Sequence, residues 1–341
     1  MILLGDQGKF ILARNSASTK KYLKGNLHLV SSLKIKFPII PSIKSETGLI
    51  THLFIGSSKS IGPTPKLADL YDPNSKKNLI KNRFPSNFIL NRQFNSFIKL
   101  LKKYEIQIYQ PDNIMKCNQL FARDLGFVID NTWVRSNIIP NRLLEMDGLD
   151  SLQQMIPVEN QLILSDEFHI EGGDVIIYDD YVFIGVYTRS DYSKLTTART
   201  NMDSIHELQK NFPKKKFVPI ELNKSNNSPK DNALHLDCCM QPVGNNFLVT
   251  CSESFTYTYQ YEWLVNLFGK NNVFDVSKKE MSRMMCNVFS ISETVVVSDK
   301  SFKRLNEWME NKNIKVEKIN FREVSKLGGL FRCVTMPLIR K

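Results

Sequence analysis

The stretch DVIIYDDYVFIGVY, residues 174–187, decides the fold. Two apolar runs, Asp174–Tyr178 and Tyr181–Tyr187, flank an Asp-Asp pair, and this pattern is typical of a β-hairpin with a tight turn. The periodicity then predicts a helix near 201–210 and a further strand near 216–221. The order of elements is therefore strand, strand, helix, strand.

The same order of elements recurs, with units that start near residues 174, 235, 288 and 332. The last unit opens at 330–337 and is cut short by the end of the chain. Since a repeat of this size cannot bury its own apolar face, the units are expected to pack on one another. We predict an α/β fold in which small sheets close into a ring, with helices outside and the first strands meeting at the centre. The second and third units are expected at 234–240, 247–251, 260–268 and 272–276, and at 288–291, 294–298, 301–311 and 314–319.

A helix is also predicted ahead of the repeats. Ser86 can cap it, and it runs through Lys103 with Phe94, Phe97 and Leu101 on one face. A strand at 106–109 follows.

The first 65 residues differ from the rest in charge. The chain carries a net charge of +12, and residues 1–60 hold nine Lys or Arg and two acids, so 9 − 2 = +7 lies there. We interpret 1–65 as a basic N-terminal extension of unclear role, faintly like an organelle import signal, and 66–341 as the catalytic domain. No apolar run approaches the ~20 residues of a membrane span. We expect a cytoplasmic protein, unless the extension directs import into an organelle. We expect neither nucleic acid nor a membrane as a partner. The oligomeric state, including a homodimer, is left open.

The six cysteines show no CxxC pair and no Cys/His spacing suited to zinc, so neither a metal nor another cofactor is expected. Without a secretion signal, reduced thiols are the expectation. Cys333 follows Gly328-Gly329 in a strand-like run and is the candidate nucleophile. The alternative is that it is a small buried hydrophobe, as most free cysteines are.

Other candidates fall in three motifs near the predicted centre: Phe121-Ala-Arg-Asp124, Glu171-Gly-Gly-Asp174 and His235-Leu-Asp237. His235 and Asp237 would share one face of a strand, with His235 as an acid-base group. The Gly-Gly pair would let a substrate approach the backbone while a carboxylate such as Asp174 faces the pocket. Each motif also has a structural interpretation as a turn or an ion pair. Together with Cys333 they indicate thiolate attack on a cationic substrate, since carboxylates pair bidentately with a guanidinium.

These motifs, in this order, resemble the guanidino-group modifying enzymes, which include arginine deiminases, amidinotransferases and dimethylarginine dimethylaminohydrolases. The resemblance covers roughly residues 66–341 and is closest to small deiminase-related proteins labelled amidinotransferase. It implies a five-bladed α/β propeller of ββαβ units, in agreement with the repeat. It also implies Cys333 as nucleophile, His235 as acid-base group and Glu171 as the carboxylate that orients His235. The substrate-binding residues that it implies are Asp124 and Asp237 for the guanidinium, Phe121 beside it, and Arg189 for the substrate carboxylate. We therefore expect a small guanidino compound as the ligand.

The implied reaction is attack of the Cys333 thiolate on the guanidinium carbon, with His235 protonating the departing nitrogen. Water would then release citrulline and ammonia from arginine through a covalent amidino-thiol intermediate. An acceptor amine in place of water would make the chain an amidinotransferase. A dimethylarginine dimethylaminohydrolase is a further alternative, although that group usually lacks an Asp at the place of Asp237. The last alternative is a non-catalytic binding protein with the same fold.

Overall fold

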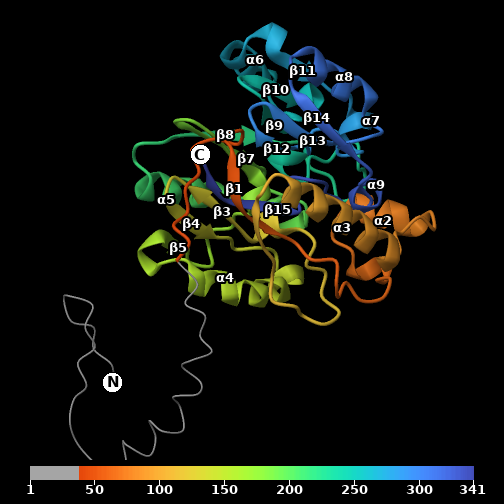
Figure 1. The fold of residues 1–341 in the computed structure, drawn as a ribbon. Coiled ribbons are helices and arrows are strands. Elements are labelled where there is room, and N and C mark those ends of the chain that lie inside the picture. Colours follow the sequence, from red (N-terminus) through yellow and green to blue (C-terminus); the bar gives the residue numbers. More distant parts are fainter. Residues whose placement is uncertain (1–37) are drawn as a thin grey trace, which may run out of the picture. The chain divides into compact units, whose positions relative to one another are not determined.

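All five sheets in the described part of the chain have three strands and share one topology (Figure 1). The computed structural model describes residues 38–341. The unit predicted first consists of β6 (Val175–Tyr178), β7 (Tyr181–Val186), α5 (Met202–Asn211) and β8 (Lys216–Glu221). The first two strands are antiparallel and joined by a hairpin, whereas the second and third are parallel, which requires the helical crossover.

Three further blades repeat this order of elements. One of them, the blade from β3 to β5, precedes β6 in the chain and was not identified by the repeat analysis. In each blade, the strand pair β3/β4, β9/β10 or β12/β13 is antiparallel, and the next pair is parallel. The bounds are β3 (Gly126–Ile129), β4 (Thr132–Arg135), α4 (Asp150–Met155) and β5 (Gln161–Ile163); β9 (Met240–Val243), β10 (Phe247–Thr250), α6 (Thr258–Phe268) and β11 (Val273–Asp275); and β12 (Phe289–Ser292), β13 (Val295–Asp299), α8 (Lys303–Asn311) and β14 (Lys315–Ile319), with short helices α7 (Lys278–Met281) and α9 (Arg322–Ser325).

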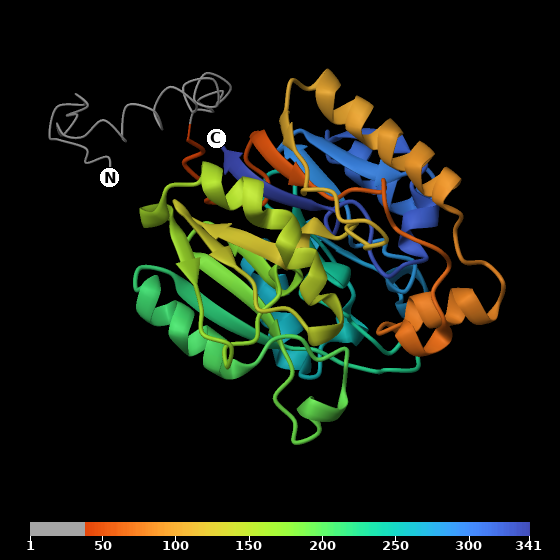
Figure 2. The ribbon, with the colours of Figure 1, turned by 90° about the horizontal axis from the view of Figure 1, so that it is seen from below.

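The fifth blade joins the two ends of the described chain. β15 (Thr335–Arg340) pairs antiparallel with β1 (Ile50–Ile55), and β1 pairs parallel with β2 (Gln107–Tyr109). The helices α2 (Pro73–Ile80) and α3 (Asn87–Lys103) make the crossover. The unit that the chain end was expected to cut short is thus completed by N-terminal residues. With five such sheets, the prediction of a five-bladed α/β propeller is confirmed, and Figure 2 shows helices on the outer side of the strands.

The compact unit runs from Ile39 to Lys341. The boundary expected at residue 65 therefore lies inside the fold, because β1 is the central strand of the fifth blade. A chain that began at Lys66 would lack this strand. The role expected for residues 1–37 lies outside the described residues.

Helix α3 has the predicted cap and apolar face. The Ser86 hydroxyl accepts a hydrogen bond from the Ile89 amide, and Phe94, Phe97 and Leu101 are buried. The Phe97 ring packs against Phe331, with 5.2 Å between ring centroids. This contact links the outer helix to the segment that carries Cys333. Among residues 38–341, no helix has the length and apolar character that a bilayer span requires.

The chain ahead of several first strands forms short 3-10 turns in place of the predicted strand ends. These turns are η2 (Ala122–Leu125), η5 (Gly172–Asp174) and η7 (Leu236–Cys238). The prediction that His235 and Asp237 lie on a strand was therefore wrong. The segment that follows His235 forms the turn η7 near the crowded centre, so hydrogen bonding between strands begins only at Met240, the first residue of β9.

Candidate active site

In each blade, a candidate polar residue stands one to three positions before the first strand. Because the first strands converge, these residues gather at the centre of the propeller. All are buried, and buried polar groups are stable only when paired. They are Asp124, Asp174, Asp237, Asn287 and Cys333.

His235 is held by a carboxylate that is itself held by an arginine. Its Nε2 lies 2.8 Å from Oε2 of Glu171, and Nη1 of Arg199 lies 2.9 and 3.0 Å from the two oxygens of that carboxylate. Burial raises the pKa of Glu171, but Arg199 and the His235 contact outweigh it and hold that pKa well below its usual value. Burial lowers the pKa of His235, whereas Asp124, Asp174 and Glu171 raise it more, so the net shift is upward. The site therefore favours the protonated imidazole.

Asp124 lies on the other side of the same imidazole. Its Oδ1 is 3.5 Å from Nδ1 of His235 and has no hydrogen-bond partner among residues 38–341. Its Oδ2 accepts a hydrogen bond from Nη1 of Arg142 at 2.5 Å, and Arg142 also forms two bonds to Glu145. A Cβ on Gly173 would lie 2.7 Å from the His235 ring, so only glycine allows this packing. The arrangement leaves one Asp124 oxygen directed at His235.

Asp237 is oriented by a buried arginine. Nη1 of Arg332 donates to Oδ2 of Asp237 at 3.0 Å, and the same guanidinium makes two bonds to Glu46 and one to the Val175 carbonyl. Burial raises the pKa of Glu46, but the charges of Arg332 and Arg123 outweigh this effect and lower that pKa to about 2. Glu46 belongs to the segment that sequence analysis assigned to an extension. It acts through Arg332 to position a site carboxylate.

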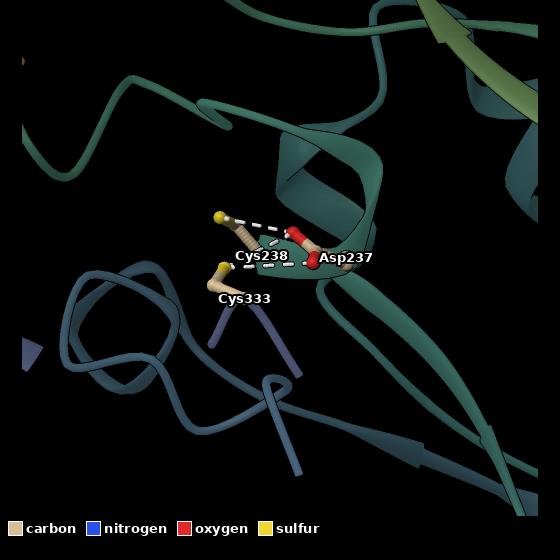
Figure 3. Close-up of side chains that lie close together, drawn as sticks. All are labelled: Asp237, Cys238 and Cys333. Carbon is tan, nitrogen blue, oxygen red and sulfur yellow. Dashed lines mark hydrogen bonds between the residues drawn. The ribbon is translucent and has the colours of Figure 1, made fainter. Parts of the chain in front are cut away.

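The Cys333 sulfur lies between Asp237 and Asn287. Its distances to the two Asp237 oxygens are 3.6 and 3.5 Å, and Figure 3 shows both Cys333 and Cys238 directed at that carboxylate. Nδ2 of Asn287 donates to the sulfur at 3.1 Å. Burial, the neighbouring Cys238 and Asp237 raise the pKa of the Cys333 thiol well above its usual value.

Phe121, predicted beside the substrate, packs near Cys333. A Cβ on Gly329 would lie 2.5 Å from the Phe121 ring and 2.8 Å from Cβ of Cys333, so these two side chains border the same glycine. The absence of a side chain at Gly329 therefore lets the ring come close to the cysteine.

Two predicted substrate contacts differ from expectation. Asp174 uses one oxygen for the Thr200 hydroxyl, at 2.8 Å, and the other for the Leu236 amide, at 2.9 Å. It fixes the backbone that follows His235 and so acts as a positioning residue. Arg189 is exposed on the loop after β7, with its guanidinium carbon 5.7 Å from the centre of the Tyr187 ring, and it is not part of the central cluster.

Sequence analysis missed the residues that hold the predicted ones. Asn287 could have been found, because it stands two positions before β12, as Cys333 does before β15. The arginines carry no such signal, since a buried arginine in a sequence looks like an exposed one. The missed residues are Glu46, Arg142, Arg199, Asn287 and Arg332.

Two groups of side chains bring possible metal-ligand atoms within 4.8 Å of one another: Asp124, Glu171 and His235, and Asp237, Cys238 and Cys333. Their carboxylates are already paired with Arg142, Arg199 and Arg332. Since these guanidinium groups supply the compensating positive charge, we assign no metal to either group.

Five ββαβ blades with these motifs at their inner ends define a member of the guanidino-group modifying superfamily, and the predicted resemblance is confirmed. More particularly, residues 74–340 match the family described as N,N dimethylarginine dimethylhydrolase, eukaryotic, and the chain belongs to that family.

Individual relatives are distant in sequence. "Uncharacterized protein YkgA" of Bacillus subtilis (strain 168) is 27% identical over 266 residues, which are 73% of this chain and 80% of the relative. Among solved structures, the N-terminal domain of ArgZ, an arginine dihydrolase from the ornithine-ammonia cycle in cyanobacteria, has a TM-score of 0.71 at 15% identity and covers 85% of this chain and 98% of its own. SxtG, an amidinotransferase from Microseira wollei, has a TM-score of 0.67 at 15% identity, over 88% of this chain and 97% of its own. The match to AgrE, with a TM-score of 0.70 at 16% identity, covers 85% of this chain and only 39% of AgrE. At these identities the structural likeness shows the fold.

Proposed function

We propose that the chain is a cysteine-dependent hydrolase of a guanidinium group, that arginine or a close unmethylated relative is its substrate, and that citrulline and ammonia are the products from arginine. One observation carries this proposal. A carboxylate oxygen of Asp124 lies 3.5 Å from the imidazole of His235, and one of Asp237 lies 3.6 Å from the Cys333 sulfur. Two carboxylates beside one acid-base group and one thiol suit a planar cation with several N–H donors.

The electrostatics support a thiolate that forms when substrate binds. Burial, together with the neighbouring Cys238 and Asp237, raises the pKa of the Cys333 thiol and favours its protonated form before substrate binds. A guanidinium bound by these carboxylates brings positive charge next to the sulfur and favours its ionisation. The thiolate then attacks the guanidinium carbon, and the tetrahedral adduct collapses with loss of one nitrogen.

The proton for that leaving nitrogen comes from His235. Its raised pKa keeps it protonated, and Glu171, fixed by Arg199, orients the ring. The amidino group remains on sulfur until water, deprotonated by the now neutral His235, attacks the same carbon. An N-terminal domain of ArgZ is described as covalently bound to a reaction intermediate, which supports a covalent route in a protein of this fold.

A second candidate is hydrolysis of dimethylarginine, which the family match favours. Asp237 argues for the unmethylated substrate, because two methyl groups on one nitrogen remove both of its donors. A buried carboxylate left partly unpaired costs roughly 1–3 kcal/mol. Transfer to an amine is the third candidate, since SxtG with the same fold is described as an amidinotransferase.

The test is mass spectrometry of the products formed by purified protein from arginine, with and without glycine or ornithine, and from asymmetric dimethylarginine. Citrulline and ammonia from arginine are expected. Release of dimethylamine from dimethylarginine, with no product from arginine, would show that dimethylarginine is the substrate. An amidino-glycine product would show that the chain is an amidinotransferase. Cys333→Ser should form no product, whereas Cys239→Ser, a buried thiol bonded to the Leu236 carbonyl, should remain active. Full turnover by Cys333→Ser would contradict the proposal.

A further inference from the structure

Two thiols, and not one, face the carboxylate of Asp237 (Figure 3). The Cys238 sulfur lies 3.5 Å from Oδ1, and the Cys333 sulfur lies 3.6 and 3.5 Å from the two oxygens. The two sulfurs and one carboxylate oxygen of Asp237 all lie within 4.8 Å of one another. The mechanism above uses Cys333 and leaves Cys238 without a role.

The two cysteines come from separate segments of the chain. Cys238 ends η7, and Cys333 lies just before β15, 333 − 238 = 95 positions later. The two sulfurs lie within 4.8 Å of each other, so movement of the side chains has to bring them to the length of a disulfide bond, about 2.05 Å. The adjacent Cys239 is directed elsewhere, since its sulfur lies 3.4 Å from the Leu236 carbonyl.

Both thiols are sheltered and interact with each other. A hydrogen bond from Cys333 lowers the pKa of Cys238, but burial and Asp237 outweigh it and raise that pKa to about 11. Cys238 is fully buried and Cys333 is 3% exposed. An oxidised Cys333 would thus meet the neighbouring thiol before a bulky external one could enter.

We propose that Cys238 and Cys333 form a reversible disulfide when hydrogen peroxide or a similar two-electron oxidant reaches the site, and that this bond switches the enzyme off. The loss of activity rests on the proposed role of Cys333 as nucleophile. Formation of the disulfide does not.

The chemistry balances with peroxide as the only oxidant. The Cys333 sulfur attacks one peroxide oxygen, the O–O bond breaks, and the sulfur becomes a sulfenic acid while the thiol proton passes to the departing hydroxide, which leaves as water. The Cys238 sulfur then attacks the sulfenic sulfur, the S–S bond forms, the S–O bond breaks, and the Cys238 proton departs in a second water. The two thiols lose two electrons, which the peroxide takes.

The experiment treats the full-length protein with hydrogen peroxide in the presence of a metal chelator, blocks remaining thiols with iodoacetamide, and maps cross-linked peptides by mass spectrometry. The expected product is a peptide pair joined through Cys238 and Cys333. Activity should fall by more than tenfold in parallel and return after dithiothreitol. A Cys333 found mainly as sulfinic acid, or joined to another cysteine, would overturn the proposal.

Cys238→Ser and Cys239→Ser form a matched pair of variants, each compared with its own untreated activity. Cys239→Ser should respond to oxidation and reductant as the wild type does. Cys238→Ser lacks the resolving thiol, so its inactivation should become irreversible and its Cys333 should gain two oxygen atoms. Recovery of oxidised Cys238→Ser by dithiothreitol to the wild-type extent would refute the switch. A cross-link in a protein that turns over no guanidine would uphold the disulfide and refute the proposed function instead.

Discussion

Asn287 donates a hydrogen bond from its Nδ2 to the sulfur of Cys333 across 3.1 Å, and its Oδ1 accepts the Cys333 amide, also at 3.1 Å. The same Oδ1 accepts the Leu330 amide, and Nδ2 also reaches the Asp237 carbonyl. One buried side chain therefore sets the turn that carries the thiol and provides a donor to the sulfur. A donor at this place stabilises the thiolate more than the thiol.

We expect Asn287→Asp to slow the reaction by roughly tenfold or more, since hydrogen bonds to charged groups contribute about 1.5–3 kcal/mol. Aspartate keeps an acceptor for the two amides and replaces the donor with a third carboxylate near the sulfur. The rate of Cys333 alkylation by iodoacetamide should fall and its pH dependence should move upward. Asn306→Asp is the control, because Asn306 is buried in α8 and its Nδ2 donates to the Asp299 carbonyl. An alkylation profile that matches the wild type would show that the Asn287 donor does not act on the sulfur.

The second prediction concerns the alkaline limb of the pH profile. The His235 pKa is raised, so the protonated imidazole is present below that pKa and is lost as the pH rises through it. Glu171→Gln removes one of the negative charges that raise it. The alkaline limb of kcat/KM should then move to lower pH, with turnover reduced on the order of a hundredfold because general acid catalysis contributes at least that much. Glu280→Gln, at a surface pair with Arg304, should leave the limb in place. If both variants keep the wild-type profile, His235 is not the acid.

Asp237 should decide which guanidine is used. The Asp237 carboxylate contacts Cys333 and Arg332, and in the proposed complex it accepts N–H bonds that asymmetric dimethylarginine lacks on one nitrogen. We expect wild-type kcat/KM to favour arginine by roughly tenfold to a hundredfold. Asp237→Asn should weaken binding and turnover and reduce this preference, whereas Asp299→Asn, a buried carboxylate in β13, should not change the ratio. A wild-type preference for dimethylarginine would reverse the proposed substrate.

Glu46 should matter for stability although it lies in the segment assigned to an extension. Glu46→Gln leaves the buried Arg332 guanidinium without its main compensating charge, and breaking such a pair costs about 3–5 kcal/mol. The pKa of Glu46 is depressed to about 2, so its contribution is complete above the ordinary value and fades as the pH falls through about 2. Urea unfolding at several pH values should show a gap between wild type and variant that narrows in acid. An equal gap at pH 7 and pH 2 would mean that the ion pair is not its cause.

Much of the fold was predictable because its signals are local. The hairpin at Asp179-Asp180, where Asp179 has a positive φ of 51°, and the cap at Ser86 depend on neighbouring residues alone. The blade from β3 to β5 was missed, because its helix α4 has only six residues, whereas the helices α5, α6 and α8 of the predicted units have nine to eleven and show a clearer periodicity. The part of the fifth blade formed by β1 was missed because its partner β15 lies nearly three hundred residues away in the sequence.

The sequence by itself determined the repeat and the class of enzyme, and it indicated the candidate reactive residues, since a cysteine, a histidine and several carboxylates recur near the predicted strand ends. Only the tertiary structure decided how those residues are paired. Asp174 holds a backbone amide and Arg189 points to solvent, whereas Arg142, Arg199 and Arg332 come from distant segments to hold the carboxylates. The physical reason is that burial makes an unpaired charge costly, so each carboxylate takes whichever cation the closed ring brings within reach. That choice depends on contacts between blades, which no local pattern records.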